Sequence, residues 1–199
     1  MSNGQRVGRV FRTTGETTIE VRIDLDGQGT HNIQTPVPFL SHMLAQLARH
    51  GGFDLDVVAT GDVEIDDHHT VEDVGLCLGE AVREALGDRL GIERFGQRRA
   101  PLDEALIDVT VDLSGRPYLV FQLDLPKAKI GTFDVELVKE FFQAFAVKGE
   151  CNLHVHQVCG QNLHHIVEAS FKAWALALRQ ATRITRTKTL IRSTKDHLD

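Results

Sequence analysis

Several features that often reveal a protein's function are absent from this chain of 199 residues. Its three cysteines form no C-x-x-C pair, which argues against a disulfide framework and against a thiolate zinc site. The sequence has no apolar run long enough to span a membrane, no charged-then-apolar leader and no phosphate-binding loop of the GxxxxGK type. We therefore expect a cytoplasmic globular protein with no membrane partner.

Basic charge is also scarce. The net charge is −6, from 22 basic and 28 acidic residues, and the basic side chains gather only near the C-terminus. Such a chain has no positive field that would attract a polyanion, so we expect no nucleic-acid partner. The one compositional excess is histidine, with ten residues.

Four of these histidines lie in a five-residue motif that occurs twice. His68-His69-Thr70-Val71-Glu72 recurs as His164-His165-Ile166-Val167-Glu168, and each copy opens a segment with helical periodicity. On a helix the glutamate shares a face with residues three and four positions before it, whereas adjacent histidines point about 100° apart. Each histidine of a pair can therefore serve a different metal ion. A single copy is also typical of a solvated helix start, but the duplication favours metal ligands.

The hydrophobic periodicity predicts the order strand, strand, helix, strand, helix twice. Val7–Thr13 and Thr17–Leu25 are predicted to form a hairpin around Gly15, and Ala105–Leu113 and Pro117–Leu125 a second hairpin around Ser114-Gly115-Arg116. The other predicted elements are a helix from Phe39 to the Gly51-Gly52 pair, a strand at 53–60, a helix from 68 to about 90, a helix at 137–149, a strand at 151–159 and a helix from 164 to about 181.

This order indicates an internal repeat, in which Gly15-Glu16 is aligned with Gly115-Arg116. A half of this size buries too little apolar surface to be very stable alone, so the two halves are expected to pack together. We predict an α+β fold of two β-β-α-β-α halves, each a small mixed sheet with helices on one face. The predicted parts are the first half at 1–91, the second half at 92–182, with a linker at about 91–101, and a basic C-terminal tail at 183–199 that closes on a phosphate site.

His42 and Glu140 occupy matching places, nine residues before the glycine that ends each short helix. Imidazole and carboxylate together suit a divalent transition metal, and eight such ligands shared by two ions leave open positions for a substrate. Manganese is favoured, and zinc, iron or cobalt would bind the same groups. His154, on a strand near the second motif, is a candidate pocket residue. The predicted ligands are His42, His68, His69, Glu72, Glu140, His164, His165 and Glu168.

Phosphate binding has to come from separated basic side chains, for which Arg94, Arg116 and Lys195 are candidates. From the residues alone, two other functions remain open. A dinuclear hydrolase acting on a phosphoester would use the same ions and basic residues, and it would release phosphate. A metal-stabilised interaction or storage module would saturate its metals and would need no basic residues near them.

Seven motifs follow one another along the chain: RTTGETTIEV, VPFLSHML, ATGDVEIDDHHTVEDVGLCLGEA, RFGQRRAPLDEAL, VDLSGRPY, GQNLHHIVEASFKA and the late STK. With these motifs in this order, the chain resembles the imidazoleglycerol-phosphate dehydratase family over nearly its full length. The resemblance implies a fold similar to the second domain of ribosomal protein S5. It also implies dehydration of imidazole glycerol phosphate to imidazole acetol phosphate in histidine biosynthesis, two Mn²⁺ ions per active site, and a homo-oligomer of 24 subunits with metals at the subunit contacts.

The resemblance further implies residue roles. All the predicted ligands except Glu140 match metal ligands of the family. Some members have a histidine at the place of Glu140, and His154 is the alternative ligand. Glu16 matches the acid/base, and we group Glu168, His69 and His165 with it as catalytic. The substrate contacts fall on Glu16, Gln46, Arg94, Arg116, Lys172, Ser193, Thr194 and Lys195.

Two more positions depart from the family pattern: Ser41 stands where many members have Asp, and the tail STKDHLD lacks the glycine that commonly follows the lysine. In the expected mechanism, a metal-bound imidazole becomes imidazolate and expels the hydroxyl of the adjacent carbon. Glu16 then moves the proton of the next carbon, and the phosphate contacts position the substrate.

Overall fold

The first half of the chain folds as a four-stranded sheet with two helices on one face. The computed structural model describes residues 6–185 and 191–194. The strand order is β1-β2-β4-β3; β2 is antiparallel to β1 and β4, and β3 is parallel to β4. The elements are β1 (Val7–Thr13), β2 (Thr17–Asp24), β3 (His31–Gln34), α1 (Pro38–Gly51), β4 (Asp54–Gly61) and α2 (His68–Leu86).

The second half repeats this arrangement and adds a small hairpin. Its sheet has the order β5-β6-β10-β7, with β7 parallel to β10, and β8 and β9 pair separately. The elements are β5 (Phe95–Leu102), β6 (Ala105–Asp112), β7 (Tyr118–Gln122), β8 (Lys129–Ile130), β9 (Phe133–Asp134), α3 (Leu137–Gly149), β10 (Asn152–Cys159) and α4 (Leu163–Thr182).

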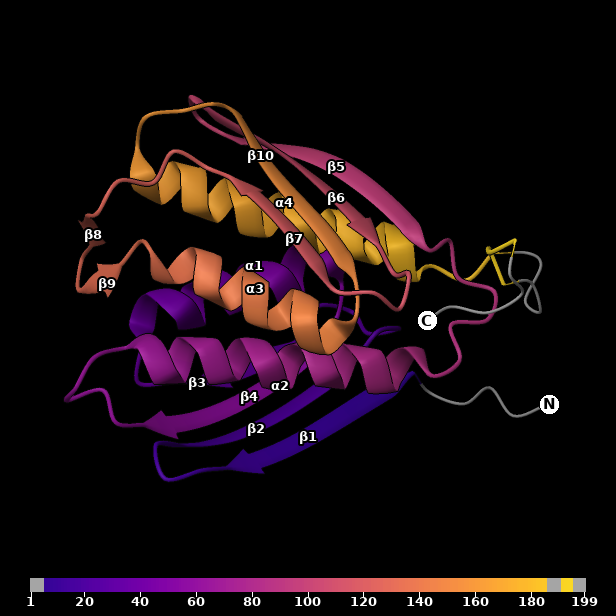
Figure 1. Cartoon of the computed structure of the whole chain (residues 1–199), viewed down its shortest axis with the longest axis horizontal. Helices are drawn as coiled ribbons and strands as arrows, with labels where there is room; N and C mark the ends of the chain where they lie inside the picture. The colour runs from indigo at the N-terminus through magenta and orange to yellow at the C-terminus, as the bar shows by residue number, and fades with distance from the viewer. Residues whose placement is uncertain (1–5, 186–190, 195–199) are drawn as a thin grey trace.

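All four major helices lie between the two sheets, which form the outer layers (Figure 1). The long helix of each half packs on its own sheet, α2 on β1 and β2, and α4 on β5 and β6. The helices also pack across the halves, because α2 contacts α3 and α1 contacts α4. Each short helix therefore lies beside the long helix of the other half, and the predicted α+β fold of two packed halves is confirmed.

Aromatic side chains fill the core between α3 and α4. The Trp174 ring is fully buried and meets four phenylalanine rings edge-on at centroid distances of 4.7 to 5.8 Å. Such edge-to-face contacts stabilise beyond the area that they bury. The four rings belong to Phe141, Phe142, Phe145 and Phe171.

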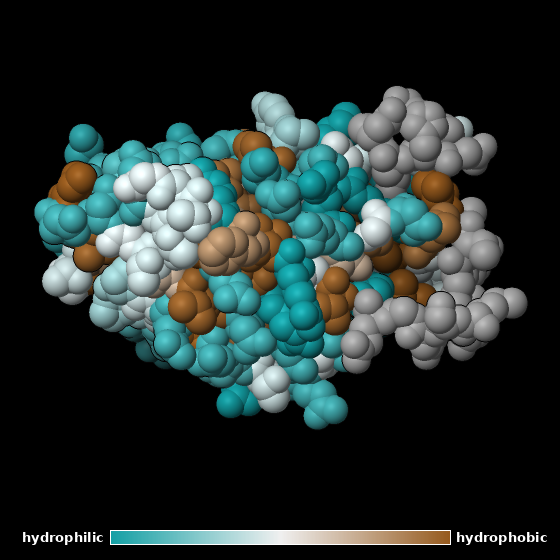
Figure 2. Space-filling view, turned by 90° about the horizontal axis from the view of Figure 1, so that it is seen from below, coloured by the Kyte–Doolittle hydropathy of each residue, from teal (hydrophilic) through white to brown (hydrophobic). Residues whose placement is uncertain are grey.

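The outer face of the first sheet is mostly hydrophilic, with separate hydrophobic residues among hydrophilic ones (Figure 2). Phe11, Glu20 and Val58 are cross-strand neighbours on β1, β2 and β4, and Phe11 is 70% exposed. Alternation along these strands places Val21 and Val57 on the opposite, fully buried face. Within the described residues, none of the helices has the length and apolar character to cross a membrane.

The predicted hairpin of Ala105–Leu113 with Pro117–Leu125 is wrong, because β10 lies between β6 and β7 in the sheet. The true hairpin joins β5 to β6 through Asp103 and Glu104. Much of the predicted linker at 91–101 is therefore a strand. β3 is a further strand that the predicted β-β-α-β-α halves did not include.

The β5–β6 hairpin gives a better alignment of the two halves than the predicted hairpin does. Gly8 of β1 and Gly96 of β5 lie 88 residues apart, and each touches a long helix: a Cβ built on them would lie 1.8 Å from the Ala81 oxygen and 1.9 Å from the Ala177 oxygen. Both sheets thus approach their helix too closely for any side chain at this point. In this alignment Glu16 corresponds to Glu104, and not to Arg116.

Candidate metal and active site

Three of the predicted ligands from different halves meet where α1 crosses the start of α4. The Nε2 atoms of His42 and His164 each lie 3.0 Å from Oε2 of Glu168. Ligand atoms of all three residues lie within 4.8 Å of one another, and among the described residues this is the one group of three such side chains that does so. Glu168 is largely buried, with 11% of its side chain exposed, whereas the His42 side chain is 46% exposed.

The group fits a divalent cation in its donor types and its spacing. Two ligand atoms about 2.1 Å from one ion and at right angles to each other lie about 3.0 Å apart, which is the separation found here. The His164 ring is further fixed by Phe39, whose ring it meets edge-on at 5.3 Å. The nitrogen and oxygen donors are therefore already gathered on one side of Glu168.

Lys172 binds the other oxygen of Glu168, with Nζ 2.6 Å from Oε1. Burial raises the pKa of the Glu168 carboxyl, but hydrogen bonds from Lys172, His42 and His164 outweigh it and lower the pKa to about 2. The carboxylate is charged at neutral pH and is available as a ligand. Lys172, predicted to contact the substrate phosphate, thus lies next to the predicted metal ligands.

The corresponding residues of the other half are less closely gathered. His68 Nε2 lies 3.6 Å from Oε2 of Glu72 on α2. Glu140, the counterpart of His42, does not join them within the distance that unites the first group in the part of the chain described. His154, the alternative ligand, lies between the inward-facing Leu153 and Val155 and stacks on His156 at 6.0 Å. It therefore lies on the face of β10 that points away from the helices.

The two histidines of each motif face different surroundings, as expected from the helix geometry. The rings of His68 and His69 are 6.2 Å apart with an interplanar angle of 81°, and those of His164 and His165 are 6.3 Å apart at 83°. Neighbouring histidines are thus nearly perpendicular.

His69 lies between two carboxylates. Its Nδ1 is 3.0 Å from Oδ2 of Asp62, which raises the pKa of His69, and its Nε2 is 3.8 Å from Oε1 of Glu16. The predicted acid/base therefore lies beside a predicted metal ligand.

His165 has the matching surroundings. Its Nδ1 lies 2.7 Å from Oε2 of Glu104, and its Nε2 lies 3.7 Å from Oδ2 of Asp103. Oε1 of Glu104 also accepts hydrogen bonds from the backbone N–H groups of Gln161 and Asn162, so that hydrogen bonds lower the pKa of Glu104 to about 2, that from His165 most of all. Neither Asp62 nor Glu104 is among the site residues predicted from the sequence. Alignment of the β1–β2 turn with the β5–β6 turn would have revealed Glu104.

Two other predicted phosphate contacts, Arg94 and Arg116, lie away from these ligands. Arg94 has a φ of 68° and binds both oxygens of Asp112, at 2.7 and 3.1 Å. Its backbone N–H binds the Ala181 oxygen at the end of α4, and its guanidinium binds the oxygen of Arg192. The side chain of Asn152 at the start of β10 binds the backbone oxygen of Arg116.

The remaining predicted substrate contacts divide between two ends of the molecule. We call the end where His42 meets Glu168 the metal end, and Arg94 lies at the opposite end. Gln46 is on α1, where its Oε1 is 3.1 Å from Nε2 of His50. Burial and the nearby Lys172 charge lower the pKa of His50, which places Gln46 at the metal end. Ser193 and Thr194 follow Arg192 at the opposite end, and Lys195 lies outside the described residues.

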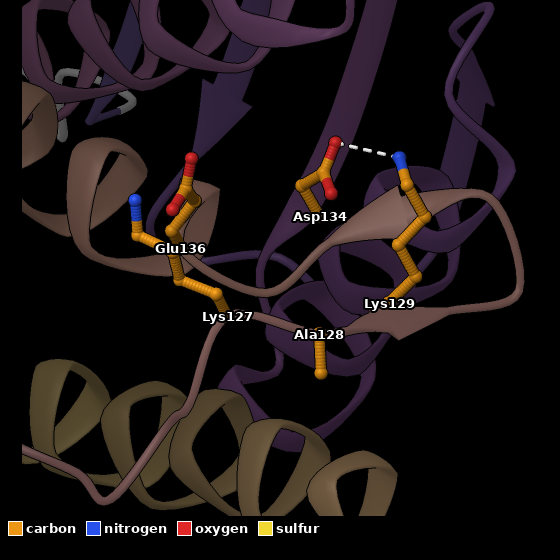
Figure 3. Close-up of a pocket in the computed structure, with 5 residues that line it drawn as sticks. All are labelled: Lys127, Ala128, Lys129, Asp134 and Glu136. Carbon is orange, nitrogen blue, oxygen red and sulfur yellow. Dashed lines mark hydrogen bonds and ion pairs between the residues drawn. The ribbon is translucent and has the colours of Figure 1, made fainter.

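A surface cavity of about 280 Å³ lies beside the β8–β9 hairpin and is lined by charged side chains (Figure 3). Lys129 and Asp134 in its wall form an ion pair at 2.7 Å. Both also act on Asp67, which precedes the first histidine pair and whose pKa is raised chiefly by burial. None of the predicted site residues lines this cavity.

The chain is similar to known proteins of one family. Residues 35–178 match the model of the imidazoleglycerol-phosphate dehydratase family. The chain is 58% identical over 179 residues to imidazoleglycerol-phosphate dehydratase of Trichlorobacter lovleyi, covering 90% of this chain and 92% of that one, and 54% identical over 193 residues to that of Geobacter sulfurreducens, covering 97% and 99%.

Solved structures are similar over most of the chain. The Staphylococcus aureus imidazoleglycerol-phosphate dehydratase matches with a TM-score of 0.82 and 40% identity, covering 90% of this chain and 99% of that one. The Pyrococcus furiosus enzyme, solved in complex with (S)-C348, matches with a TM-score of 0.83 and 40% identity, covering 95% and 100%. This chain belongs to the imidazoleglycerol-phosphate dehydratase family.

Proposed function

We propose that the chain removes water from imidazole glycerol phosphate to give imidazole acetol phosphate, as a metal-dependent hydro-lyase of histidine biosynthesis. The observation that carries the metal dependence is the convergence of His42, His164 and Glu168 from two halves onto one point. Family membership supports the reaction, because similarity extends over nearly the whole of both chains. A cytoplasmic location fits the three free thiols, since such thiols persist in a reducing compartment.

Two Mn²⁺ ions are the proposed cofactor, and other divalent ions would bind the same donors. The residues proposed to hold them are the predicted set of imidazoles and carboxylates, with Glu140 as the least gathered member. When bound, the ions would hold the substrate's imidazole ring and stabilise its deprotonated form. Glu72 and Glu168 supply the negative charge that favours a cation there.

Glu16 is proposed as the acid/base. Its carboxylate is 55% exposed on the β1–β2 turn, and so it is accessible to a substrate bound at His69. It would take the proton from the carbon beyond the one that loses its hydroxyl, a role that typically contributes about 10²–10⁴-fold in rate. The ring nitrogens and the reacting carbons would lie together at this end of the chain.

The phosphate contacts support a homo-oligomer as the active form. His164 starts α4, whereas Arg94 binds its other end at Ala181. Seventeen residues of helix separate these points by about 25 Å, too far for one small substrate to reach both. We therefore propose that Arg94 and the tail of one subunit bind the phosphate of a substrate held at the metal end of another subunit. Both would belong to the shell of 24 subunits that the family resemblance implies.

The test measures two products from the same reaction. Purified protein with Mn²⁺ and imidazole glycerol phosphate should form the keto product without release of inorganic phosphate. Phosphate release without the keto product would indicate a phosphoester hydrolase, and neither product would indicate a binding module. Glu16→Gln should retain metal and substrate binding while turnover is nearly abolished. His164→Ala should lower the metal content and shift the assembly towards smaller oligomers.

A further inference from the structure

A buried polar cluster lies directly behind the turn that carries Glu16. The Thr17 hydroxyl donates to Oδ2 of Asp73 on α2 at 2.5 Å, and the guanidinium of Arg12 on β1 forms an ion pair with the same oxygen. Thr17 is 3% exposed and Asp73 is 6% exposed, whereas the Arg12 side chain is 37% exposed. The cluster thus joins both arms of the β1–β2 hairpin to the helix that carries His69 and Glu72.

The turn itself is tied to this cluster by hydrogen bonds. The Thr14 hydroxyl oxygen accepts from the backbone N–H groups of Glu16 and Thr17, each at 3.1 Å. The backbone oxygen of Glu16 accepts from the N–H of Asp62, whose side chain holds His69. The positions of the Glu16 and His69 side chains are therefore linked.

The second half serves as an internal control, since it has the same hairpin without the cluster. Arg12 pairs with Ile19, and its counterpart Ala100 pairs with Ile107 in the same register. A Cβ at Gly61 would meet Thr17 and Thr70, and one at Gly160 would meet their counterparts Ala105 and Ile166. The three polar positions Arg12, Thr17 and Asp73 thus correspond to Ala100, Ala105 and Ala169, all buried.

The alanines at the matching positions of the second half distinguish a structural role of the polar cluster from a positioning role. A buried ion pair is costly to desolvate and is often no more stabilising than apolar residues in its place. The second half shows that the hairpin forms and packs on its long helix with alanine at all three places. Burying a carboxylate in the first half therefore needs a reason other than folding. The first half is also the half that carries Glu16, where the second half has Glu104 bound to His165 and to backbone.

We propose that Arg12, Thr17 and Asp73 are positioning residues that fix the Glu16 turn against α2, so that the Glu16 carboxylate is held beside His69. This inference rests on the proposed function, in which Glu16 is the acid/base. A reacting group displaced by about 1 Å can lose about 100-fold in rate, whereas binding of a substrate through remote contacts is little affected. The cluster therefore acts on kcat, and not on KM or metal binding.

The decisive experiment compares two substitutions at one position. Thr17→Val keeps the shape of the side chain and removes the donor to Asp73, and Thr17→Ser keeps the donor. With Mn²⁺-loaded enzyme, Thr17→Val should lower kcat about tenfold or more, while KM, Mn²⁺ affinity and oligomer size stay close to those of the parent. The unfolding temperature should fall, because the buried Asp73 carboxylate loses a donor, but the protein should remain folded at the assay temperature. Thr17→Ser should restore kcat to within about twofold. Thr182→Val, which removes a buried hydroxyl at the far end of α4, should leave kcat unchanged.

A second variant copies the other half. The triple change Arg12→Ala, Thr17→Ala and Asp73→Ala should assemble as the parent does and lower kcat about 100-fold. An unchanged kcat in Thr17→Val, or an equal loss in Thr17→Ser, overturns the proposal, as does a loss explained by lower metal affinity or by unfolding at the assay temperature. Comparison with Glu16→Gln distinguishes failure of the positioning proposal from failure of the proposed function. If Glu16→Gln is inactive and Thr17→Val is fully active, the positioning proposal fails and the proposed function stands. A fully active Glu16→Gln refutes the role of Glu16 itself.

Discussion

The carboxylate behind His165 offers a sharp test of metal binding. Glu104 accepts at Oε2 from Nδ1 of His165, which keeps the ring proton on Nδ1 and leaves the Nε2 lone pair free for a cation. Glu104→Gln keeps an oxygen for the backbone N–H groups of Gln161 and Asn162 but turns an amide NH₂ towards the ring. Because that NH₂ donates to Nδ1, the ring proton moves to Nε2, where it blocks coordination.

The size of the effect follows from the exposure of the carboxylates. Outer partners of metal-binding histidines typically contribute about 10–100-fold to metal affinity. The Glu104 side chain is 44% exposed and water can partly replace it, so we expect a loss of about tenfold. Asp62→Asn should lower the metal affinity by closer to 100-fold, because Asp62 holds His69 and its side chain is only 16% exposed.

Calorimetric titration of metal-free protein with Mn²⁺ measures these losses directly. Asp103→Asn is the matched control, because this carboxylate belongs to the same turn, is 75% exposed and lies 3.7 Å from Nε2. It should change the affinity by no more than about twofold. Equal affinity of the parent and Glu104→Gln, or equal losses in Glu104→Gln and Asp103→Asn, would refute the reasoning.

Three further predictions concern packing, acid sensitivity and thiol access. Gly8→Ala should reduce the free energy of unfolding in urea by about 1–3 kcal/mol or more, because its Cβ would lie 1.8 Å from the Ala81 oxygen. An unchanged denaturation midpoint would contradict the close contact. The lowered pKa of Glu168 adds stability that is complete above about pH 4.5 and is lost as the pH falls towards 2. Lys172→Met should raise this pKa and move the acid unfolding curve to higher pH, and a curve at the same pH would exclude the ion pair. A thiol reagent should label exposed Cys159 in the native protein and all three cysteines in denaturant, whereas rapid native labelling of the other two would contradict their burial.

Much of the site could be predicted because its signals are local. The two histidine motifs need only the helix period to give perpendicular rings, and the structure places them so. The convergence of His42 on His164 and Glu168 is different, since it depends on how α1 packs across the halves. Only the resemblance and the duplicated motif pointed to it.

The failures come from turns that carry no glycine signal. Ser114-Gly115-Arg116 is typical of a hairpin turn, whereas the true turn is Asp103-Glu104, where Asp103 takes a φ of 47° that aspartate tolerates. The 88-residue spacing of the strands becomes 96 at the histidine motifs, because the β8–β9 hairpin adds residues before α3. The predicted alignment of Glu16 with Arg116, at an offset of 100, lay close to the 96 of the motifs and hid the match of Glu16 to Glu104. β3 was missed because its four residues are mostly polar and exposed, without alternation.

The crossing of the short helices has a consequence for how the molecule would respond to its ions. A cation held by His42 on one side and by His164 and Glu168 on the other would cross-link residues 126 positions apart in the chain. Separation of the halves would then require its release, so an ion at 100 times its dissociation constant would add about 2.7 kcal/mol to the free energy of unfolding. Depletion of divalent ions would weaken the docking of the two duplicated units on each other.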